Sequence, residues 1–250
     1  MSTYSEYQEC INTFIHLDKI EWNFKSNPKY NYMLEHVWEQ LGKDCLSEII
    51  NRFYLFFTKN KNYLIELCNI NDLYGEPNKA IFNDFTTCSP TNIRYILHSL
   101  LILTHMNECL LKDVDLIEIG GGYGGLCFFL NKLSIFFNIN IKSYTIFDLH
   151  EPLLLQEKYL DELNISNVNF AQIHNFKNIK ENSFFVSTYA FSEIEIELQK
   201  EYTQKILNQY VSHGFIAWNS IDLYDFIENK NISSEIEFPL SGPKNLYVKF

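Results

Sequence analysis

A run of glycines after a short apolar segment constrains this chain more than any other feature. Residues 118–125 read Glu-Ile-Gly-Gly-Gly-Tyr-Gly-Gly and follow the apolar segment 114–119. Glycine lets the backbone turn sharply and lets a ligand approach without a Cβ clash. Gly120, Gly122 and Gly125 satisfy the GxGxxG pattern of dinucleotide-binding turns. Because five glycines in six positions satisfy several patterns, the run predicts a ligand-binding turn without fixing the ligand.

Short β-branched or aromatic runs alternate with helical patterns over residues 111–250. The predicted strands cover 114–119, 142–147, 168–173, 183–188, 214–219, 235–238 and 246–250. The predicted helices cover 123–137, 151–164, 194–211 and 221–230. Five strand-and-helix units indicate a parallel sheet covered on both faces. The turn between the last two strands is too short for a helical crossover, so these strands should be antiparallel.

The first 110 residues show no convincing strand alternation and repeat apolar residues at three- and four-residue spacing, which predicts helices. Ser89 and Pro90 are typical of a helix start, and that helix should run to about His105. Gly and Pro mark residues 71–78 as a loop. We therefore predict a helical N-terminal region over 1–110, followed over 111–250 by an α/β domain with a mostly parallel sheet.

Composition excludes several functional classes. The chain has 250 residues, of which 46% are apolar, so it can bury a large core. A net charge of −11 disfavours binding to nucleic acids and to anionic membranes. Six cysteines without CxxC spacing indicate free thiols in a reducing compartment, and we expect a cytoplasmic protein. The start lacks the pattern of a signal peptide, and no apolar run approaches the ~20 residues of a membrane-spanning helix.

Two carboxylates follow neighbouring predicted strands. Glu118 ends the first strand, where burial is costly unless a cation or a hydrogen-bond donor meets the carboxylate. A pyrophosphate would repel it, whereas a ligand with an ammonium group would not. Asp148 ends the next strand, where an acid can accept both hydroxyls of a ribose; a helix N-cap is its alternative role. A ribose suits NAD(P) as well as S-adenosylmethionine, so an NAD(P)-dependent oxidoreductase stays an alternative.

With these motifs, residues 115–205 resemble the sugar O-methyltransferase family of class I S-adenosylmethionine-dependent methyltransferases. The resembling stretches are 118–125, 147–152, 155–160 and 187–193. The family usually has Asp-Leu-Pro-Glu where this chain has Asp148-Leu149-His150-Glu151, a departure that concerns only the local turn. The resemblance implies a Rossmann-like sheet of seven mostly parallel strands with an antiparallel last strand. It also implies S-adenosyl-L-methionine as cofactor and a sugar or nucleotide-sugar hydroxyl as acceptor.

Ligands of open α/β sheets lie beyond the carboxyl ends of the strands. We therefore look for candidate site residues at or just after the end of each predicted strand. A sugar hydroxyl is a weak nucleophile that needs alignment and a base, and the catalytic candidates are Glu193 and His174. The predicted cofactor-binding residues are Glu118, Gly120, Gly121, Gly122, Tyr123, Asp148, Leu149, Ile173, Tyr189 and Arg94.

Several of these candidates have an ordinary structural alternative. Glu193 suits the first turn of a helix, where the helix dipole favours an acid. Tyr189 suits packing, His174 suits a partly exposed surface, and Arg94 suits a surface salt bridge in place of a clamp on a carboxylate or phosphate. Tyr123 is predicted to cover the cofactor, because an aromatic face attracts a sulfonium cation.

No acidic cluster marks a metal site, so we favour a metal-free mechanism. A magnesium site built from Glu193 and Asp222 is the alternative. We expect a small-molecule sugar or nucleotide-sugar acceptor, no nucleic-acid or membrane partner, and an assembly compatible with a homodimer. A non-catalytic binding protein with a methyltransferase fold is the remaining hypothesis.

Overall fold

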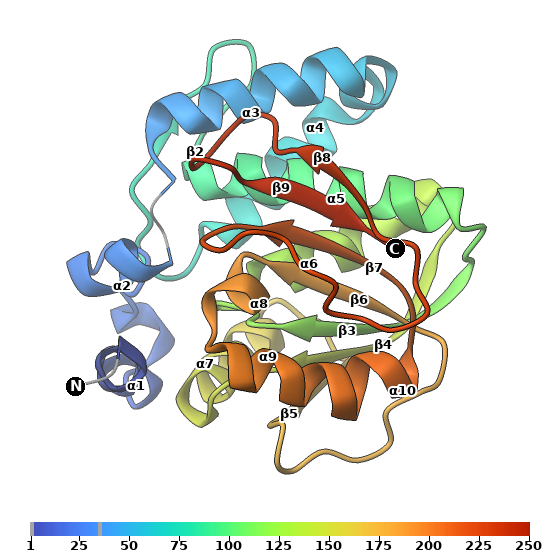
Figure 1. Ribbon diagram of the computed structural model, residues 1–250. Helices are drawn as coiled ribbons and strands as arrows, with labels where there is room; N and C mark the ends of the chain where they lie inside the picture. Colours follow the sequence, from blue (N-terminus) through green and yellow to red (C-terminus); the bar gives the residue numbers. More distant parts are fainter. Residues whose placement is uncertain (1–2, 35–36) are drawn as a thin grey trace.

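The computed structural model describes residues 3–34 and 37–250. A seven-stranded sheet lies at its centre, in the order β5-β4-β3-β6-β7-β9-β8 (Figure 1). The strands are β3 (Asp113–Ile119), β4 (Asn140–Phe147), β5 (Val168–Ala171), β6 (Ser183–Thr188), β7 (Val211–Trp218), β8 (Ser233–Ile236) and β9 (Leu246–Lys249).

The direction of the strands confirms the predicted Rossmann-like α/β fold. Strands β3 to β7 pair in parallel, and β9 pairs antiparallel with both β7 and β8. The last strand in sequence is thus inserted between the fifth and the sixth, with reversed direction. Each predicted strand is present, although β8 begins and ends two residues before its predicted range.

Helices cover both faces of the sheet. One face carries α5 (Pro90–Glu108), α6 (Gly125–Leu133) with the 3-10 turn Ser134–Phe137, and α7 (His150–Glu162). The other carries α9 (Ile196–Tyr202), the π-helical turn Thr203–Leu207 and α10 (Asn208–Tyr210), preceded by the short α8 (Ala190–Glu193) (Figure 1). Ser89 caps α5 as predicted, since its side chain accepts from the Thr91 N–H at 3.3 Å.

The predicted helix over 221–230 is wrong. These residues are irregular, and Phe226 and Ile227 are buried against the end of β7. The Phe226 ring stacks on the Trp218 ring with 5.3 Å between centroids, and the Trp218 indole N–H donates to the Ile221 carbonyl at 2.8 Å. Packing of these aromatic side chains therefore overrides the local helical pattern.

The N-terminal region is mostly helical. Its elements are α1 (Thr3–Ile15), the 3-10 turn Lys19–Glu21, α2 (Pro28–Met33), α3 (Glu39–Arg52), α4 (Tyr54–Asn71) and the strands β1 (Ala80–Ile81) and β2 (Thr87–Cys88). The antiparallel pair β1–β2 was not predicted, because two-residue strands are too short to show alternation.

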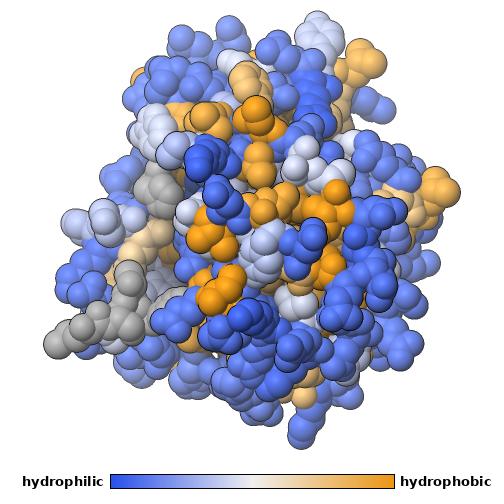
Figure 2. All heavy atoms as spheres, viewed as in Figure 1, coloured by the Kyte–Doolittle hydropathy of each residue, from blue (hydrophilic) through white to orange (hydrophobic). Residues whose placement is uncertain are grey.

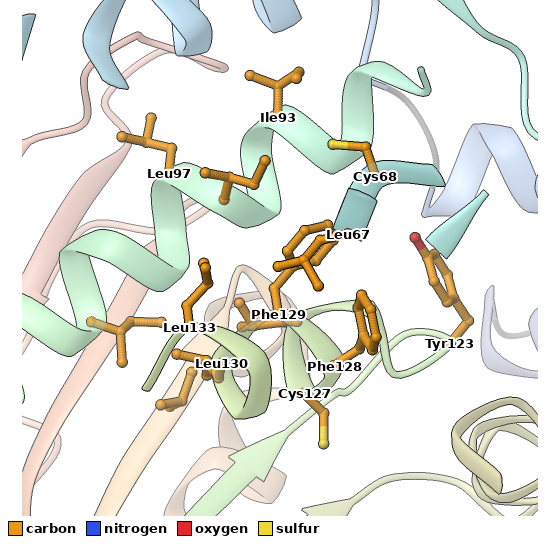
Figure 3. Packing of buried hydrophobic residues seen from close by; sticks show 14 of the residues in the cluster. Leu67, Cys68, Ile93, Leu97, Tyr123, Cys127, Phe128, Phe129, Leu130 and Leu133 are labelled. Atoms are coloured by element: carbon orange, nitrogen blue, oxygen red, sulfur yellow. The ribbon is translucent and has the colours of Figure 1, made fainter. Parts of the chain in front are cut away.

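One buried apolar cluster extends from α1 to β9, so the N-terminal helices and the α/β sheet share a core. In Figure 3, Phe129 of α6 points toward Leu67 of α4 under α5, whereas Cys127 points the opposite way.

All six cysteines are free. Within 3–34 and 37–250, none of the helices has the length and apolar character that crossing a membrane requires. Figure 2 shows the molecular surface from the same side as Figure 1. Most side chains on this surface are hydrophilic, and the apolar ones gather along its middle.

Candidate functional site

The glycine loop between β3 and α6 is a tight bend at the carboxyl end of the sheet. The Gly120 N–H donates to the Phe147 carbonyl of β4 at 2.9 Å, which joins the bend to the neighbouring strand. Gly120, Gly122 and Gly124 have φ of 75°, 57° and 95°, a region that residues with a side chain rarely adopt. A Cβ on Gly120 would lie only 2.1 Å from the Cβ of Ala190, so the bend also packs closely against α8.

Gly120→Ala should lower the free energy of unfolding by about 2 kcal/mol, because the added methyl group meets Ala190 and strains the backbone. Gly122→Ala is the matched control, since φ is also positive there but the nearest heavy atom to its new Cβ is Tyr95 Oη at 3.8 Å. Urea denaturation should therefore show the larger loss for Gly120→Ala. Equal losses would mean that the Ala190 contact does not matter.

Glu118 lies beneath this bend and is only 1% exposed. The Tyr144 hydroxyl on β4 donates to Glu118 Oε2 at 2.9 Å. The pKa of Glu118 is raised to about 8, mainly by burial; the Tyr144 hydrogen bond lowers it in part, and the nearby Asp148 carboxylate contributes to the rise. The carboxyl group therefore holds a proton at neutral pH, and a cation brought next to it would favour the charged form.

Asp148 follows β4 and faces the same bend. Its carboxylate accepts from the Gly121 N–H at 3.2 Å and from the Leu149 N–H at 2.8 Å. Burial raises the pKa of Asp148 to about 6, and its hydrogen bonds oppose the shift. Leu149, not Asp148, is the N-cap residue of α7, so the alternative N-cap role does not apply. The structure thus brings Glu118, the glycines, Asp148 and Leu149 together in one cluster. That they bind a cofactor stays a prediction.

Gln156 of α7 completes this cluster and was not among the predicted site residues. It is fully buried, and its Nε2 donates to Asp148 Oδ2 at 2.8 Å and to the Gly122 carbonyl at 2.9 Å. Its Oε1 is buried without a hydrogen-bond partner among the residues that the structure describes. A polar residue on the apolar face of the predicted helix 151–164 was the signal that could have identified it.

Tyr123 does not have the predicted place over a cofactor. It is 1% exposed, and its ring packs against Phe24 and Tyr159 with centroids 5.6 and 5.0 Å away. Its hydroxyl accepts from Asn71 Nδ2 at 3.0 Å. The side chain therefore points into the core under the N-terminal region, so Tyr123 anchors the glycine loop from behind.

Arg94 and Tyr189 lie together at the end of β6. The Arg94 guanidinium lies 5.2 Å from the Tyr189 ring centroid, and Arg94 is 7% exposed. The Tyr189 hydroxyl donates to Glu237, a buried carboxylate that also accepts from the Ser241 N–H at 2.9 Å. Tyr189 has φ of 72°, and its burial raises the pKa of the phenol far above the ordinary value. Arg94 is therefore not a surface ion-pair residue.

His98, one turn after Arg94, lies beside this pair. It is 1% exposed, and its Nε2 is 3.5 Å from the Tyr189 hydroxyl. Burial and the Arg94 charge lower the pKa of His98 to about 3, so the ring is neutral. Glu237 and His98 were not among the predicted site residues, because the β8–β9 connection meets α5 only in the folded chain.

Glu193 is the last residue of α8 and is exposed. Asn219, which follows β7, donates from its Nδ2 to Glu193 Oε1. Asn219 is itself fixed by Ser192, whose hydroxyl donates to Asn219 Oδ1 at 2.7 Å and accepts from the Asn219 N–H at 2.9 Å. The ends of β6 and β7 thus hold the Glu193 carboxylate in one orientation at the carboxyl edge of the sheet.

His174 and Ile173 lie after β5. The His174 side chain is 73% exposed, and its Nδ1 lies 3.2 Å from Glu201 Oε1 of α9. This placement matches the alternative of a surface histidine, and its ion pair joins it to α9 on the surface. Ile173 is 7% exposed and packs in the core on the α9 face of the sheet.

Acidic residues do not converge on a metal site in the described part of the chain. Across 3–34 and 37–250, no group of three or more His, Cys, Asp or Glu side chains has a metal-binding arrangement. Asp222, the predicted alternative partner of Glu193, instead lies 3.3 Å from Lys244 Nζ. Metal independence stays a prediction.

Comparisons with known proteins give only distant likenesses. No protein-family model matches the sequence, and no curated protein is similar to it. A protein of Methanococcus maripaludis, described as an S-adenosyl-L-methionine-dependent methyltransferase, has a TM-score of 0.40 and 16% identity over 64% of this chain and 63% of that one. Mitomycin 7-O-methyltransferase MmcR has a TM-score of 0.45 and 9% identity over 64% and 55%.

Geranyl diphosphate methyltransferase in complex with S-adenosyl-L-methionine has a TM-score of 0.38 and 8% identity over 52% of this chain and 51% of that one. The matched region is less than two thirds of each of these three structures (63%, 55% and 51%).

Proposed function

We propose that this chain is an S-adenosyl-L-methionine-dependent O-methyltransferase that acts on a sugar hydroxyl. The buried Glu118 carboxyl under the glycine bend carries this proposal. Desolvation raises the pKa of this carboxyl to about 8, and a cation placed beside it would favour its charged form, whereas an anion would oppose it. The ammonium end of S-adenosyl-L-methionine suits this position, whereas the pyrophosphate of NAD(P) does not.

The residues around the bend suit the rest of this cofactor. Asp148 lies at the strand end where a ribose is held, and its carboxylate has three donors, which leaves acceptor capacity for a hydroxyl. The unpartnered Gln156 Oε1 is a further acceptor next to it. We expect Gly120 to Gly122 to allow close approach of the cofactor. Arg94 is the proposed cation near the cofactor carboxylate.

S-adenosyl-L-methionine, when bound, supplies an electrophilic methyl group on a sulfonium sulfur. The chain has to align an acceptor hydroxyl with that methyl group and to remove the hydroxyl proton. Glu193 is the proposed base, because it follows β6 at the carboxyl edge and Asn219 holds its carboxylate. His174 is left out of this proposal, since its ring is exposed and paired with Glu201.

The sugar acceptor rests on the family resemblance of residues 115–205. We propose that residues 1–110 form a wall of the site. Two observations support this role. Gln8 of α1 donates to Glu151 Oε2 of α7 at 2.6 Å, and the Asp148 carboxylate adds to the effect of burial in raising the pKa of Tyr7. Helix α1 therefore lies over the Asp148 side of the site.

The free cysteines support action in the cytoplasm.

Calorimetry with S-adenosyl-L-methionine, its demethylated product and NAD(H) tests the cofactor. We expect the first two to bind at micromolar concentration and NAD(H) not to bind. Binding of NAD(H) alone would favour the oxidoreductase alternative, and folded protein that binds none of the three would exclude the proposal.

Glu193→Gln should lower methyl transfer to a sugar acceptor by about 100-fold, because the acceptor hydroxyl loses its base. Cofactor affinity should stay unchanged, since Glu193 lies outside the glycine-loop cluster. Radiolabelled methyl transfer measures the first quantity and calorimetry the second. His174→Gln is the control and should transfer at the wild-type rate. Unchanged turnover in Glu193→Gln would reject Glu193 as the base, and transfer to no sugar tested would favour a non-catalytic binding protein.

A further inference from the structure

Lys25 is a buried cation that no step of the proposed reaction uses. It is 1% exposed and lies between α1 and α2, in the N-terminal region. Its Nζ is 4.4 Å from the ring centroid of Tyr123, 4.7 Å from that of Tyr159 and 5.7 Å from that of Phe24. Aromatic faces at these distances attract an ammonium group. Three rings from three segments of the chain thus surround one charge.

Two hydrogen bonds also hold this ammonium group. Lys25 Nζ donates to the Tyr159 hydroxyl at 2.9 Å and to the Asn71 carbonyl. A buried charge is costly, and an apolar side chain of similar length would fill the same space without that cost. The ammonium group therefore has a role beyond filling the core, and its contacts indicate what that role is.

One of those contacts leads directly into the glycine loop. Tyr123 stands between Gly122 and Gly124, whose φ values are 57° and 95°. Its hydroxyl accepts from Asn71 Nδ2 at 3.0 Å, and the Tyr159 hydroxyl donates to Asn71 Oδ1 at 2.7 Å. Glycines restrain the backbone weakly, so a loop of this composition needs side-chain anchors. Tyr123 is such an anchor, and Lys25 lies against its ring.

Other contacts fix Lys25 itself. The Lys25 N–H donates to the Gly75 carbonyl at 2.9 Å. Gly75 has φ of 88°, and a Cβ there would lie 2.8 Å from Lys25 Cγ, so the lysine stem fills the space over this turn. The backbone and the stem of Lys25 are thus held by the loop after α4, while its ammonium group reaches the glycine loop and α7.

We propose that Lys25 is a positioning residue for the cofactor site. It holds Tyr123 in place, and through Tyr123 it holds the glycine loop in the conformation that receives the cofactor. Cofactor affinity therefore depends on a residue of the N-terminal region that does not touch the cofactor. That the ligand is S-adenosyl-L-methionine rests on the proposed function. That Lys25 holds the glycine loop in place does not depend on it.

Two lysine variants of the full chain test the inference. Lys25→Met keeps the apolar stem and removes the charge. Lys158→Met is the control: Lys158 Nζ donates to the Ile15 carbonyl and so also joins α7 to the N-terminal region, but this lysine is exposed. Titration calorimetry with S-adenosyl-L-methionine should give at least tenfold weaker binding for Lys25→Met and binding within twofold of wild type for Lys158→Met.

Hydrogen exchange of the unliganded proteins separates this inference from the proposed function. Peptides that cover residues 120–125 should exchange at least fivefold faster in Lys25→Met and at the wild-type rate in Lys158→Met. Wild-type exchange in Lys25→Met, or an equal increase in both variants, would overturn the inference. If the wild type binds no S-adenosyl-L-methionine, the proposed function fails. The exchange rates alone then decide whether Lys25 holds the glycine loop.

Tyr159→Phe is the second variant, for use if Lys25→Met does not fold. It removes one acceptor of the ammonium group, together with the hydrogen bond from Tyr159 to Asn71, and keeps the ring. It should accelerate exchange of residues 120–125 in the same direction by a smaller factor. Unchanged exchange in Tyr159→Phe would count against the inference in that case.

Discussion

Glu118→Gln is expected to weaken S-adenosyl-L-methionine binding by a factor of about 300, or roughly 3.4 kcal/mol. Glutamine keeps the size of the side chain and can still accept from the Tyr144 hydroxyl. It cannot supply the negative charge, so the ammonium group would be buried without a counter-charge. Titration calorimetry on the folded variant measures the loss directly.

The exposed Glu193→Gln provides the control for this change, because it makes the same Glu-to-Gln substitution at the same edge of the sheet. It should bind the cofactor as tightly as the wild type. Binding by Glu118→Gln within threefold of wild type would show that the buried carboxylate does not meet the ammonium group. The cofactor assignment would then lose its main support.

Stability of the unliganded protein should fall as the pH rises from 5 to 9. The Glu118 pKa has an ordinary value of 4.5 and is raised to about 8 by burial, so the folded state keeps a proton that the unfolded chain has lost. Stability is then fully present below about 4.5 and is lost progressively as the pH passes through about 8. At about 1.4 kcal/mol per unit, the loss is on the order of 5 kcal/mol. Asp148, raised from 3.8 to about 6, adds a loss at lower pH.

Urea denaturation at pH 5, 7 and 9 measures this dependence, and Glu118→Gln isolates its source. The variant has no carboxyl to ionise, so it should be more stable than the wild type at pH 9 and should lose little stability between pH 7 and 9. Repulsion within a chain of net charge −11 acts on both proteins, and the difference between them removes it. Parallel profiles for the two proteins would contradict the raised pKa of Glu118.

The order of elements in the α/β domain could be predicted because its signals are local. Apolar runs mark β3, β4, β6 and β7, and the short connection after β8 fixes the antiparallel pair with β9. The helix over 221–230 could not be predicted correctly. Its pattern suits a helix, but Phe226 also packs against Phe191 and Phe250, which are far from it in the sequence and meet it only in the folded chain.

The glycine-loop cluster shows the same division at the level of side chains. Glu118 and Asp148 were predicted as site residues, because Glu118 lies at the end of β3 and Asp148 directly follows β4. Gln156 and Tyr144 were missed, since their roles arise from pairing across the sheet and from the approach of α7. Tyr123 was predicted beside a cofactor, yet its ring packs on Phe24 of the N-terminal region.

The sheet, the glycine bend and the two acids at its edge could be predicted from the sequence, because backbone preference and hydrophobic periodicity act over a few neighbouring residues. The partners of those acids, the direction of the Tyr123 side chain and the position of Lys25 behind the bend are properties of the folded chain. These features depend on contacts between residues far apart in the chain, such as Lys25 and Tyr159. Desolvation and pairing of charges exist only once those segments have packed together.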